Sequence, residues 1–405
     1  MPSWADYGLV LAAAIATTAL LVPLVRMLAV RVGAVVRPDE RRVHTRPTPT
    51  LGGVGMLAGF LVGMAVAWRL DAFGPVFDNN TEPLGLVIAA VVILVVGVID
   101  DLREVSAPAK ASGIVLAASV LVFSGVSILT LRVPFVSTFI LDPNWSYLLS
   151  VLWVLGMTNA INFIDGLDGL AAGIVAIAAG TFFLYARQLV HEGSLQPGNI
   201  GPLIAVLVFG ICIGFLPYNV HPARIFMGDG GALLLGLLMA ASTMVVGGRT
   251  ETPVSGQTFF FFAPVFIPLV ILGVPILDTA FAIVRRARTR TSPATADKDH
   301  LHHRLMRLGH GHRRSVFILW GWTLLLSGFV LYPTYTHKGD AIVPFGIAAL
   351  GLALYTLLHP GLRDARRAEE AERSEAQKVD ERDDAPSLNG CEPTSSQAPR
   401  SPTTS

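Results

Sequence analysis

Four short polar stretches stand between the long apolar runs of this sequence, and their residue types are those of phosphate chemistry. NAINFIDGLDGLAAG covers residues 159–173, VIDDLRE covers 98–104, HPARIFMGDGG covers 221–231 and DKDHLHHRLMRLGHGHRR covers 297–314. Hard divalent cations such as Mg²⁺ bind carboxylate and amide oxygens, and Arg binds phosphate oxygens through paired hydrogen bonds. The mixture predicts a site for a cation and polyanions, built on the carboxylates Asp100, Asp101, Asp165, Asp168 and Asp229.

The carboxylates also have a simpler interpretation. A single Asp such as Asp100 at a helix end is often a cap or a solvated charge. Adjacent Asp100 and Asp101 repel each other, which gains the fold nothing unless a cation is present, so we favour a functional role for the pair. Asn159 and Asn162 are three residues apart and would share one face of a helix.

The histidines of the fourth stretch have two interpretations. They are candidate zinc ligands, but no Cys accompanies them and their close spacing is not a helical pair, so we favour contact with phosphate or sugar. The two cysteines, Cys212 and Cys391, are expected to be inert. The formal net charge of +1 gives no indication of nucleic-acid binding.

The elements that position these stretches are predicted to be membrane helices. Hydrophobic residues make up 52% of the chain, charged residues only 15%, and the mean hydropathy is +0.59. A helix of about 20 apolar residues crosses a bilayer, and only helices or closed barrels satisfy their backbone there. We predict an all-α polytopic membrane protein with about eleven spans near residues 6–28, 51–70, 84–99, 109–129, 146–162, 168–187, 199–216, 230–247, 258–284, 315–335 and 341–359.

Basic residues set the predicted orientation, because Lys and Arg near span ends remain on the cytoplasmic side. They gather in the loops after the first and ninth predicted spans, which places the N-terminus outside and the C-terminus in the cytoplasm. All four polar stretches then fall on the cytoplasmic side, although carboxylates played no part in the assignment. The first span lacks a basic region ahead of it and is expected to be retained. Residues 1–360 are predicted to form the membrane domain and 361–405 a polar, disordered tail.

Five motifs resemble those of a known family. PDERRVHTRPTPTLGG (38–53), VIDDLRE (98–104), NAINFIDGLDGLAAG (159–173), FMGDGGALLLG (226–236) and HLHHRL (300–305) are similar, in order and spacing, to the polyprenyl-phosphate N-acetylhexosamine-1-phosphate transferases of the glycosyltransferase 4 superfamily. The His-x-His-His-Arg loop looks like that of the bacterial enzymes that use UDP-GlcNAc. Relatives that use UDP-MurNAc-pentapeptide tend to carry three consecutive histidines.

The resemblance implies a role for each matching residue. Asp100 and Asp101 look like the catalytic aspartate pair at the lipid phosphate, and the resemblance leaves open which of them acts as base or nucleophile. Glu104 stands where several relatives have a third Asp. Asn162 and Asp229 resemble the metal ligands, with Mg²⁺ expected and Mn²⁺ as an alternative. The substrate-binding positions implied in the same way are Lys110, Asn159, Asp165, Asp168, His300, His302, His303 and Arg304.

The implied reaction transfers GlcNAc-1-phosphate from UDP-GlcNAc to undecaprenyl or decaprenyl phosphate and releases UMP. It would be the first membrane step of cell-envelope polysaccharide synthesis, on the cytoplasmic face of a bacterial cell membrane. A UDP-MurNAc-pentapeptide phosphotransferase is the alternative within the family, and an ion-coupled transporter or a lipid-binding scaffold are alternatives from other classes. The sequence shows no internal repeat of the kind transporters carry. A homodimer is left open.

Overall fold

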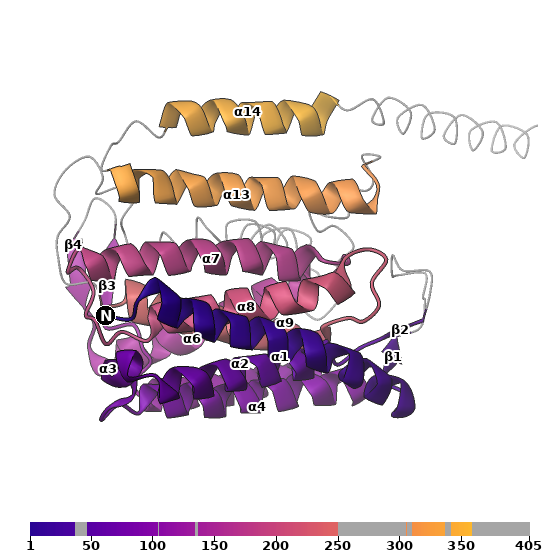
Figure 1. Cartoon of the computed structure of the whole chain (residues 1–405), viewed down its shortest axis with the longest axis horizontal. Coiled ribbons are helices and arrows are strands. Elements are labelled where there is room, and N and C mark those ends of the chain that lie inside the picture. The colour runs from indigo at the N-terminus through magenta and orange to yellow at the C-terminus, as the bar shows by residue number, and fades with distance from the viewer. Residues whose placement is uncertain are drawn as a thin grey trace, which may run out of the picture.

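The chain folds as a bundle of long helices with two short pairs of strands (Figure 1). A computed structural model describes residues 1–36, 47–103, 105–133, 137–249, 305, 310–336 and 342–358. The helices are α1 Trp4–Arg31, α2 Gly52–Arg69, the 3₁₀ turn η1 Asp71–Phe73, α3 Gly74–Phe77, α4 Glu82–Arg103, α5 Ala107–Phe123, α6 Pro143–Ile164, α7 Leu170–His191, α8 Gly201–Asn219, α9 Gly228–Gly247, α13 His312–Thr336 and α14 Ile342–Leu358.

The described residues confirm a polytopic helical membrane protein. Eight of their helices are long and apolar enough to cross a bilayer: α1, α2, α4, α6, α7, α8, α9 and α13. Two further predicted spans appear as the shorter apolar helices α5 and α14. The predicted span at 258–284 lies outside the described residues, as does the predicted tail at 361–405. The total of eleven therefore stays a prediction.

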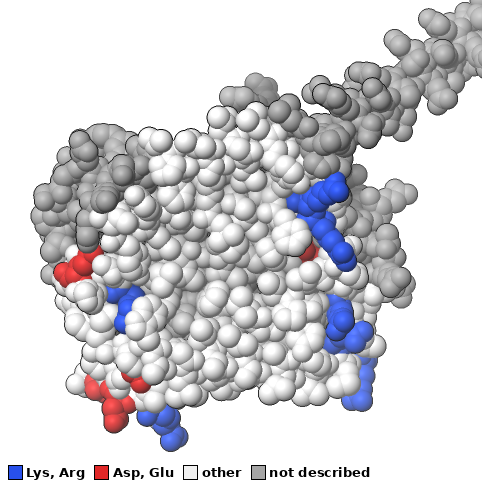
Figure 2. Space-filling view, turned by 45° about the horizontal axis from the view of Figure 1, so that its top comes forward, with Lys and Arg blue, Asp and Glu red and all other residues white. Residues whose placement is uncertain are grey.

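The strands mark the two ends of the bundle. β1 (Val35–Val36) pairs antiparallel with β2 (Thr48–Pro49), and β3 (Thr130–Val133) pairs antiparallel with β4 (Ser137–Ile140). The two pairs lie at opposite ends in Figure 1, and we call these ends the β1–β2 end and the β3–β4 end. A broad belt without Lys, Arg, Asp or Glu separates them on the face shown in Figure 2. The all-α prediction did not include these strands, which lie outside the long apolar helices.

Helix α9 lies at the centre of the bundle. It packs against α2, α4, α6, α7 and α8, and its apolar stretch is buried along the full length. A helix that is apolar on all sides belongs inside a protein or a membrane, and α9 is inside both. On the other side of the bundle, α7, α13 and α14 follow one another as successive layers (Figure 1).

Glycines let the backbones around α9 approach one another closely. A side chain at Gly97 of α4 would collide with the backbone of Gly230, and one at Gly53 of α2 would collide with that of Gly231. At the far side of α9, Gly236 lies against the backbone of Thr158 in α6. Small residues at such contacts are typical of helix packing in membranes. Two of these contacts involve the first turn of α9, so they fix where that helix begins.

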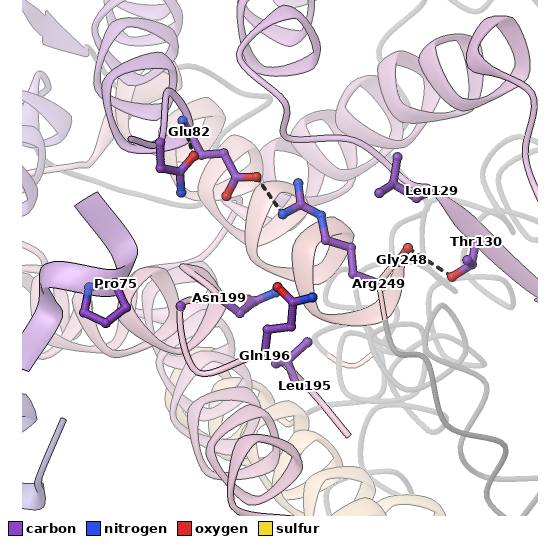
Figure 3. Close-up of a pocket in the computed structure, with 11 residues that line it drawn as sticks. Pro75, Glu82, Leu129, Thr130, Leu195, Gln196, Asn199, Gly248 and Arg249 are labelled. Atoms are coloured by element: carbon purple, nitrogen blue, oxygen red, sulfur yellow. Dashed lines mark hydrogen bonds and ion pairs between the residues drawn. The ribbon is translucent and has the colours of Figure 1, made fainter. Parts of the chain in front are cut away.

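The β3–β4 end is closed by a polar contact between α4 and the end of α9. The Glu82 carboxylate forms an ion pair with the Arg249 guanidinium at 2.6 Å, and the Thr130 hydroxyl donates to the Gly248 carbonyl at 3.0 Å (Figure 3). These side chains line a cavity of about 480 Å³ together with Asn199. The cavity lies at the opposite end of α4 and α9 from Asp101 and Asp229.

We expect Gly97→Ala to destabilise the protein by about 1–3 kcal/mol, because the added methyl group must displace the backbone of α9. Thermal melting in detergent should show a lower Tm. Gly156→Ala is the matched control, since Gly156 lies within α6 and nothing lies within 4 Å of its would-be side chain. There the gain in helix propensity, about 1 kcal/mol, should leave the Tm equal or higher. Equal melting of the two variants would contradict this packing.

Candidate active site

Residues from three of the four polar stretches (98–104, 159–173 and 221–231) meet at the β1–β2 end around the first turn of α9. Asp100 and Asp101 stand in the last turn of α4, and Lys110 stands in the first turn of α5. Asn162 stands in the last turn of α6, and Asp229 is the second residue of α9. The sequence separations are large, yet the contacts described below join all five residues.

The Lys110 ammonium is held by oxygens from three helices. Its Nζ atom lies 2.8 Å from Asp100 Oδ2, 2.5 Å from Asp229 Oδ2 and 3.4 Å from Asn162 Oδ1. The Asn162 amide also donates to Asp229 Oδ1 at 2.7 Å. A single positive charge thus sits among two carboxylates and an amide oxygen. The side chains are 17% exposed for Lys110 and 32% for Asp229, so ligands from water can reach them.

Asp101 has a different environment from its neighbour. Its Oδ1 accepts the backbone N–H of Asp229 at 2.9 Å, and its Oδ2 accepts that of Gly230 at 3.3 Å. The first N–H groups of a helix have no partner within the helix, and a carboxylate there is also favoured by the helix dipole. Asp101 therefore caps the buried start of α9 from another helix. Asp100 instead accepts the Val105 N–H at 2.7 Å through Oδ1, which leaves Oδ2 for Lys110.

Residues 49–53 hold the other side of the same turn. The N–H groups of Gly52 and Gly53 donate to the carbonyls of Phe226 and Met227 at 3.0 and 2.9 Å, and the Phe226 N–H donates to Pro49. Gly228 follows with φ +70°, and a side chain there would collide with Asp101 and Thr50. Only glycine fits this conformation and this approach without strain. The motifs that end in LGG and begin with FMGD are thereby joined backbone to backbone.

The loop between α6 and α7 adds two more carboxylates. Burial, together with the nearby charges of Asp229, Asp101 and Asp168, raises the pKa of Asp165 to about 8. Asp168 instead binds His221: its Oδ2 lies 2.7 Å from His221 Nδ1 and accepts the Ala223 N–H at 3.0 Å. Asp165 thus belongs to the electrostatic field of the cluster, whereas Asp168 turns toward the loop after α8.

The remaining predicted residues fall into two groups. Asn159 donates to the Leu155 carbonyl of its own helix at 2.7 Å, and no described residue of the carboxylate cluster forms a hydrogen bond with its side chain. Glu104 lies outside the described residues, and so do His300, His302, His303 and Arg304. Their roles stay predictions.

His221 and the imidazole of His312 that stacks on it were not among the residues predicted for the site. His221 lies within HPARIFMGDGG and His312 within the His-rich stretch, so both were in view as parts of motifs. Their rings stack with centroids 4.2 Å apart. No spacing rule relates residues 91 positions apart, and only the packing of α13 on α7 brings them together.

The donor set at the cluster suits a hard divalent cation. Asp100, Asp229 and Asn162 offer oxygens, and the only positive group among them is Lys110, so the described residues carry an excess of negative charge there. A cavity of about 500 Å³ opens beside Asp101 and Thr50, between the β1 strand and the end of α4. The arrangement can hold a cation and place a phosphate group beside Lys110.

Comparison with known proteins agrees with this chemistry. The family model described as Glycosyl transferase family 4 matches residues 83–247. A protein of Mycolicibacterium smegmatis named decaprenyl-phosphate N-acetylglucosaminephosphotransferase is 38% identical over 339 residues, which cover 82% of this chain and 84% of that protein. A Bacillus subtilis protein named probable undecaprenyl-phosphate N-acetylglucosaminyl 1-phosphate transferase is 35% identical over 319 residues, covering 78% and 82%.

A third relative carries the other activity considered above. The phospho-N-acetylmuramoyl-pentapeptide-transferase of Desulforudis audaxviator is 34% identical over 337 residues, covering 76% of this chain and 90% of that protein. The motif-based resemblance is therefore confirmed by identity that extends over most of the chain. The protein belongs to glycosyl transferase family 4.

Proposed function

We propose that this protein transfers GlcNAc-1-phosphate from UDP-GlcNAc to undecaprenyl or decaprenyl phosphate and releases UMP. One observation carries the proposal: Asp100, Asp229 and Asn162 surround one cationic group at the end of a membrane bundle. Phosphoryl transfer needs alignment of the reacting groups and neutralisation of their charge more than covalent help from the protein. The names of the relatives from M. smegmatis and B. subtilis support the GlcNAc donor and the polyprenyl acceptor.

In the proposed reaction a phosphate oxygen of the lipid attacks the β-phosphorus of UDP-GlcNAc. A new P–O bond forms, the bond from the β-phosphorus to the bridging oxygen breaks, and UMP leaves with that oxygen. Lys110 would bind phosphate oxygens as a point charge once substrates displace its present carboxylate partners. A lipid phosphate is already ionised near pH 7, so Asp100 need only orient it or accept a second proton. Asp101, engaged by two backbone N–H groups, would act by positioning Asp229.

A divalent cation is part of the proposal. Asp229 and Asn162, with Asp100 beside them, would hold Mg²⁺ or Mn²⁺ through oxygens, and the ion would neutralise charge on the diphosphate. The excess of carboxylates around Lys110 supports this assignment. Asp165 supports it too: burial and, next to it, the charges of Asp229, Asp101 and Asp168 raise the pKa of its carboxyl, and a cation nearby would offset the effect of those charges.

The proposed location is the cytoplasmic face of a bacterial cell membrane. Arg31 and Arg103 lie at the β1–β2 end, where the candidate site is, and Lys and Arg near span ends favour the cytoplasm. Figure 2 shows basic side chains gathered at this end of the visible face. A site at the membrane surface also lets a soluble nucleotide sugar meet a lipid whose chain stays in the bilayer.

We expect purified protein in detergent to release UMP when it is given Mg²⁺, UDP-GlcNAc and a polyprenyl phosphate. One UMP should form for each lipid-linked sugar. Replacing UDP-GlcNAc by UDP-MurNAc-pentapeptide should give little or no UMP, and EDTA should stop the reaction. Folded protein, verified by gel filtration, that releases no UMP would overturn the proposal. If only the pentapeptide donor were turned over, the family assignment would stand, but the proposed donor substrate would be wrong.

Asp229→Asn and Lys110→Gln are each expected to lower kcat by at least about 100-fold, because Asp229 would hold the cation and Lys110 would bind a phosphate oxygen of the transferring group. The change should appear in initial rates of UMP release at saturating substrates. Asp78→Asn is the control, since Asp78 is an exposed carboxylate beyond α3 at the β3–β4 end. Rates within threefold of wild type in either site variant would remove that residue from the site.

The raised pKa of Asp165 predicts a pH-dependent stability. A carboxyl whose pKa is higher in the folded protein stabilises the fold fully below its unfolded value, 3.8, and loses that contribution as pH rises through about 8. Without divalent cations, Asp165→Asn should therefore raise the Tm at pH 9 by about 2 °C or more, and raise it less at pH 5. Mg²⁺ should shrink the gain at pH 9. A gain that does not depend on pH would refute the assignment.

A further inference from the structure

A second polar cluster lies beside the candidate active site and uses nitrogen donors. Asp168 comes from the loop before α7, His221 from the loop after α8 and His312 from the start of α13. One potential ligand atom from each residue lies within 4.8 Å of the other two. Asp168 and His221 already approach within 2.7 Å, and the two imidazoles stack at 4.2 Å. Three elements separated in the sequence thus present a carboxylate and two imidazoles to one point.

One donor of this cluster lacks a partner. The Nε2 atom of His312 is buried, and no hydrogen-bond partner for it occurs in the part of the chain that the structure describes. A buried polar atom left without a hydrogen-bond partner destabilises the fold. The backbone of Asp168 also lies near the ring, so the imidazole is surrounded by Asp168 and His221. A bound ion would use the unpartnered nitrogen.

The surroundings make the cluster reachable from one side. It opens onto a cavity of about 330 Å³, whose wall is formed by Val316, Phe317 and Trp320 of α13. The His221 side chain is 39% exposed, whereas Asp168 is 9% exposed. The nearby guanidinium of Arg313 donates to the His221 carbonyl at 3.2 Å and is exposed. Its positive charge would repel a bound cation, and its exposure to water weakens that repulsion.

We propose that Asp168, His221 and His312 form a second metal site, for a divalent ion of the zinc class. Two imidazoles and one carboxylate are donors that suit Zn²⁺, whereas Mg²⁺ prefers oxygens alone. Two ligand atoms that bind one zinc ion at tetrahedral angles, each about 2.0–2.2 Å from it, lie about 3.4 Å apart. Side-chain rotations would bring the present separations, from 2.7 Å to at most 4.8 Å, to that value. Three protein ligands leave a fourth position, and the cavity gives room for water there.

The proposed ion would have a structural consequence for the bundle. Among the described helices, α13 makes extensive contacts with α7 and α14 alone. Coordination would tie its first residue to the loops that precede α7 and α9. Zinc at this site would thus hold α13 against the part of the protein that carries Asp165 and Asp229.

The test uses the full chain, purified in detergent with a tag free of histidine, stripped with a chelator and dialysed against Zn²⁺. Wild type is expected to bind one zinc ion tightly, and His221→Ala and His312→Ala should each weaken binding by roughly 100-fold or more. Co²⁺ should give the visible absorption of a tetrahedral site in wild type and lose it in both variants. Glutamine variants replace any alanine variant that fails gel filtration.

Two controls separate this site from other histidines. His191→Ala removes an exposed histidine at the opposite end of α7 and should keep the zinc. The triple variant His300→Ala, His302→Ala and His303→Ala should keep it as well. Zinc bound with unchanged affinity by both His221→Ala and His312→Ala, or lost only in the triple variant, would overturn the proposal. Because no substrate is present, this result is independent of the transferase assay.

Discussion

The buried N-terminus of α9 is the constraint on which the rest of the structure depends. A helix enclosed on all sides by other helices cannot leave its first N–H groups to water, and unpaired groups in such a place are costly. Asp101 supplies the partner for two of them from the end of α4. Glycines at positions 53, 97 and 228 let the neighbouring backbones come close enough for this contact. Because the Asp229 N–H donates to Asp101, the same contact fixes the position of the Asp229 side chain.

Charge then explains why the turn is suited to phosphate chemistry. Asp100 and Asp229 approach each other closely and share the Lys110 ammonium, with Asn162 completing the set. Like charges held this close favour a cation, and a site that binds both a cation and an ammonium group can receive anionic substrates. Membership of glycosyl transferase family 4 fits a site with these parts. The adjacent aspartates have different partners: Asp100 binds the Lys110 ammonium, whereas Asp101 accepts the first N–H groups of α9.

Much of this architecture could be predicted from the sequence, for physical reasons that differ between features. Long apolar runs predict helices because lipid leaves the backbone few choices, and ten of the predicted spans coincide with described helices. The positions of Lys and Arg in the loops predicted the orientation of the spans, and that orientation placed the carboxylates at one end. The sequence did not separate Asp100 from Asp101, because adjacent residues on a helix point in different directions that only the neighbouring helices define. It also did not pair Asp168 with His221, since that contact depends on how two loops pack.

An experimental structure of the full chain with Mg²⁺ and UDP-GlcNAc would show whether Asp229 holds the cation while Asp101 caps α9. We predict a cation about 2.0–2.1 Å from oxygens of Asp229 and Asn162, with the Lys110 ammonium moved onto a phosphate oxygen. We also predict that Asp101 still accepts the N–H groups of Asp229 and Gly230. A cation bound away from Asp229, or one coordinated by Asp101 with the start of α9 uncapped, would contradict these roles.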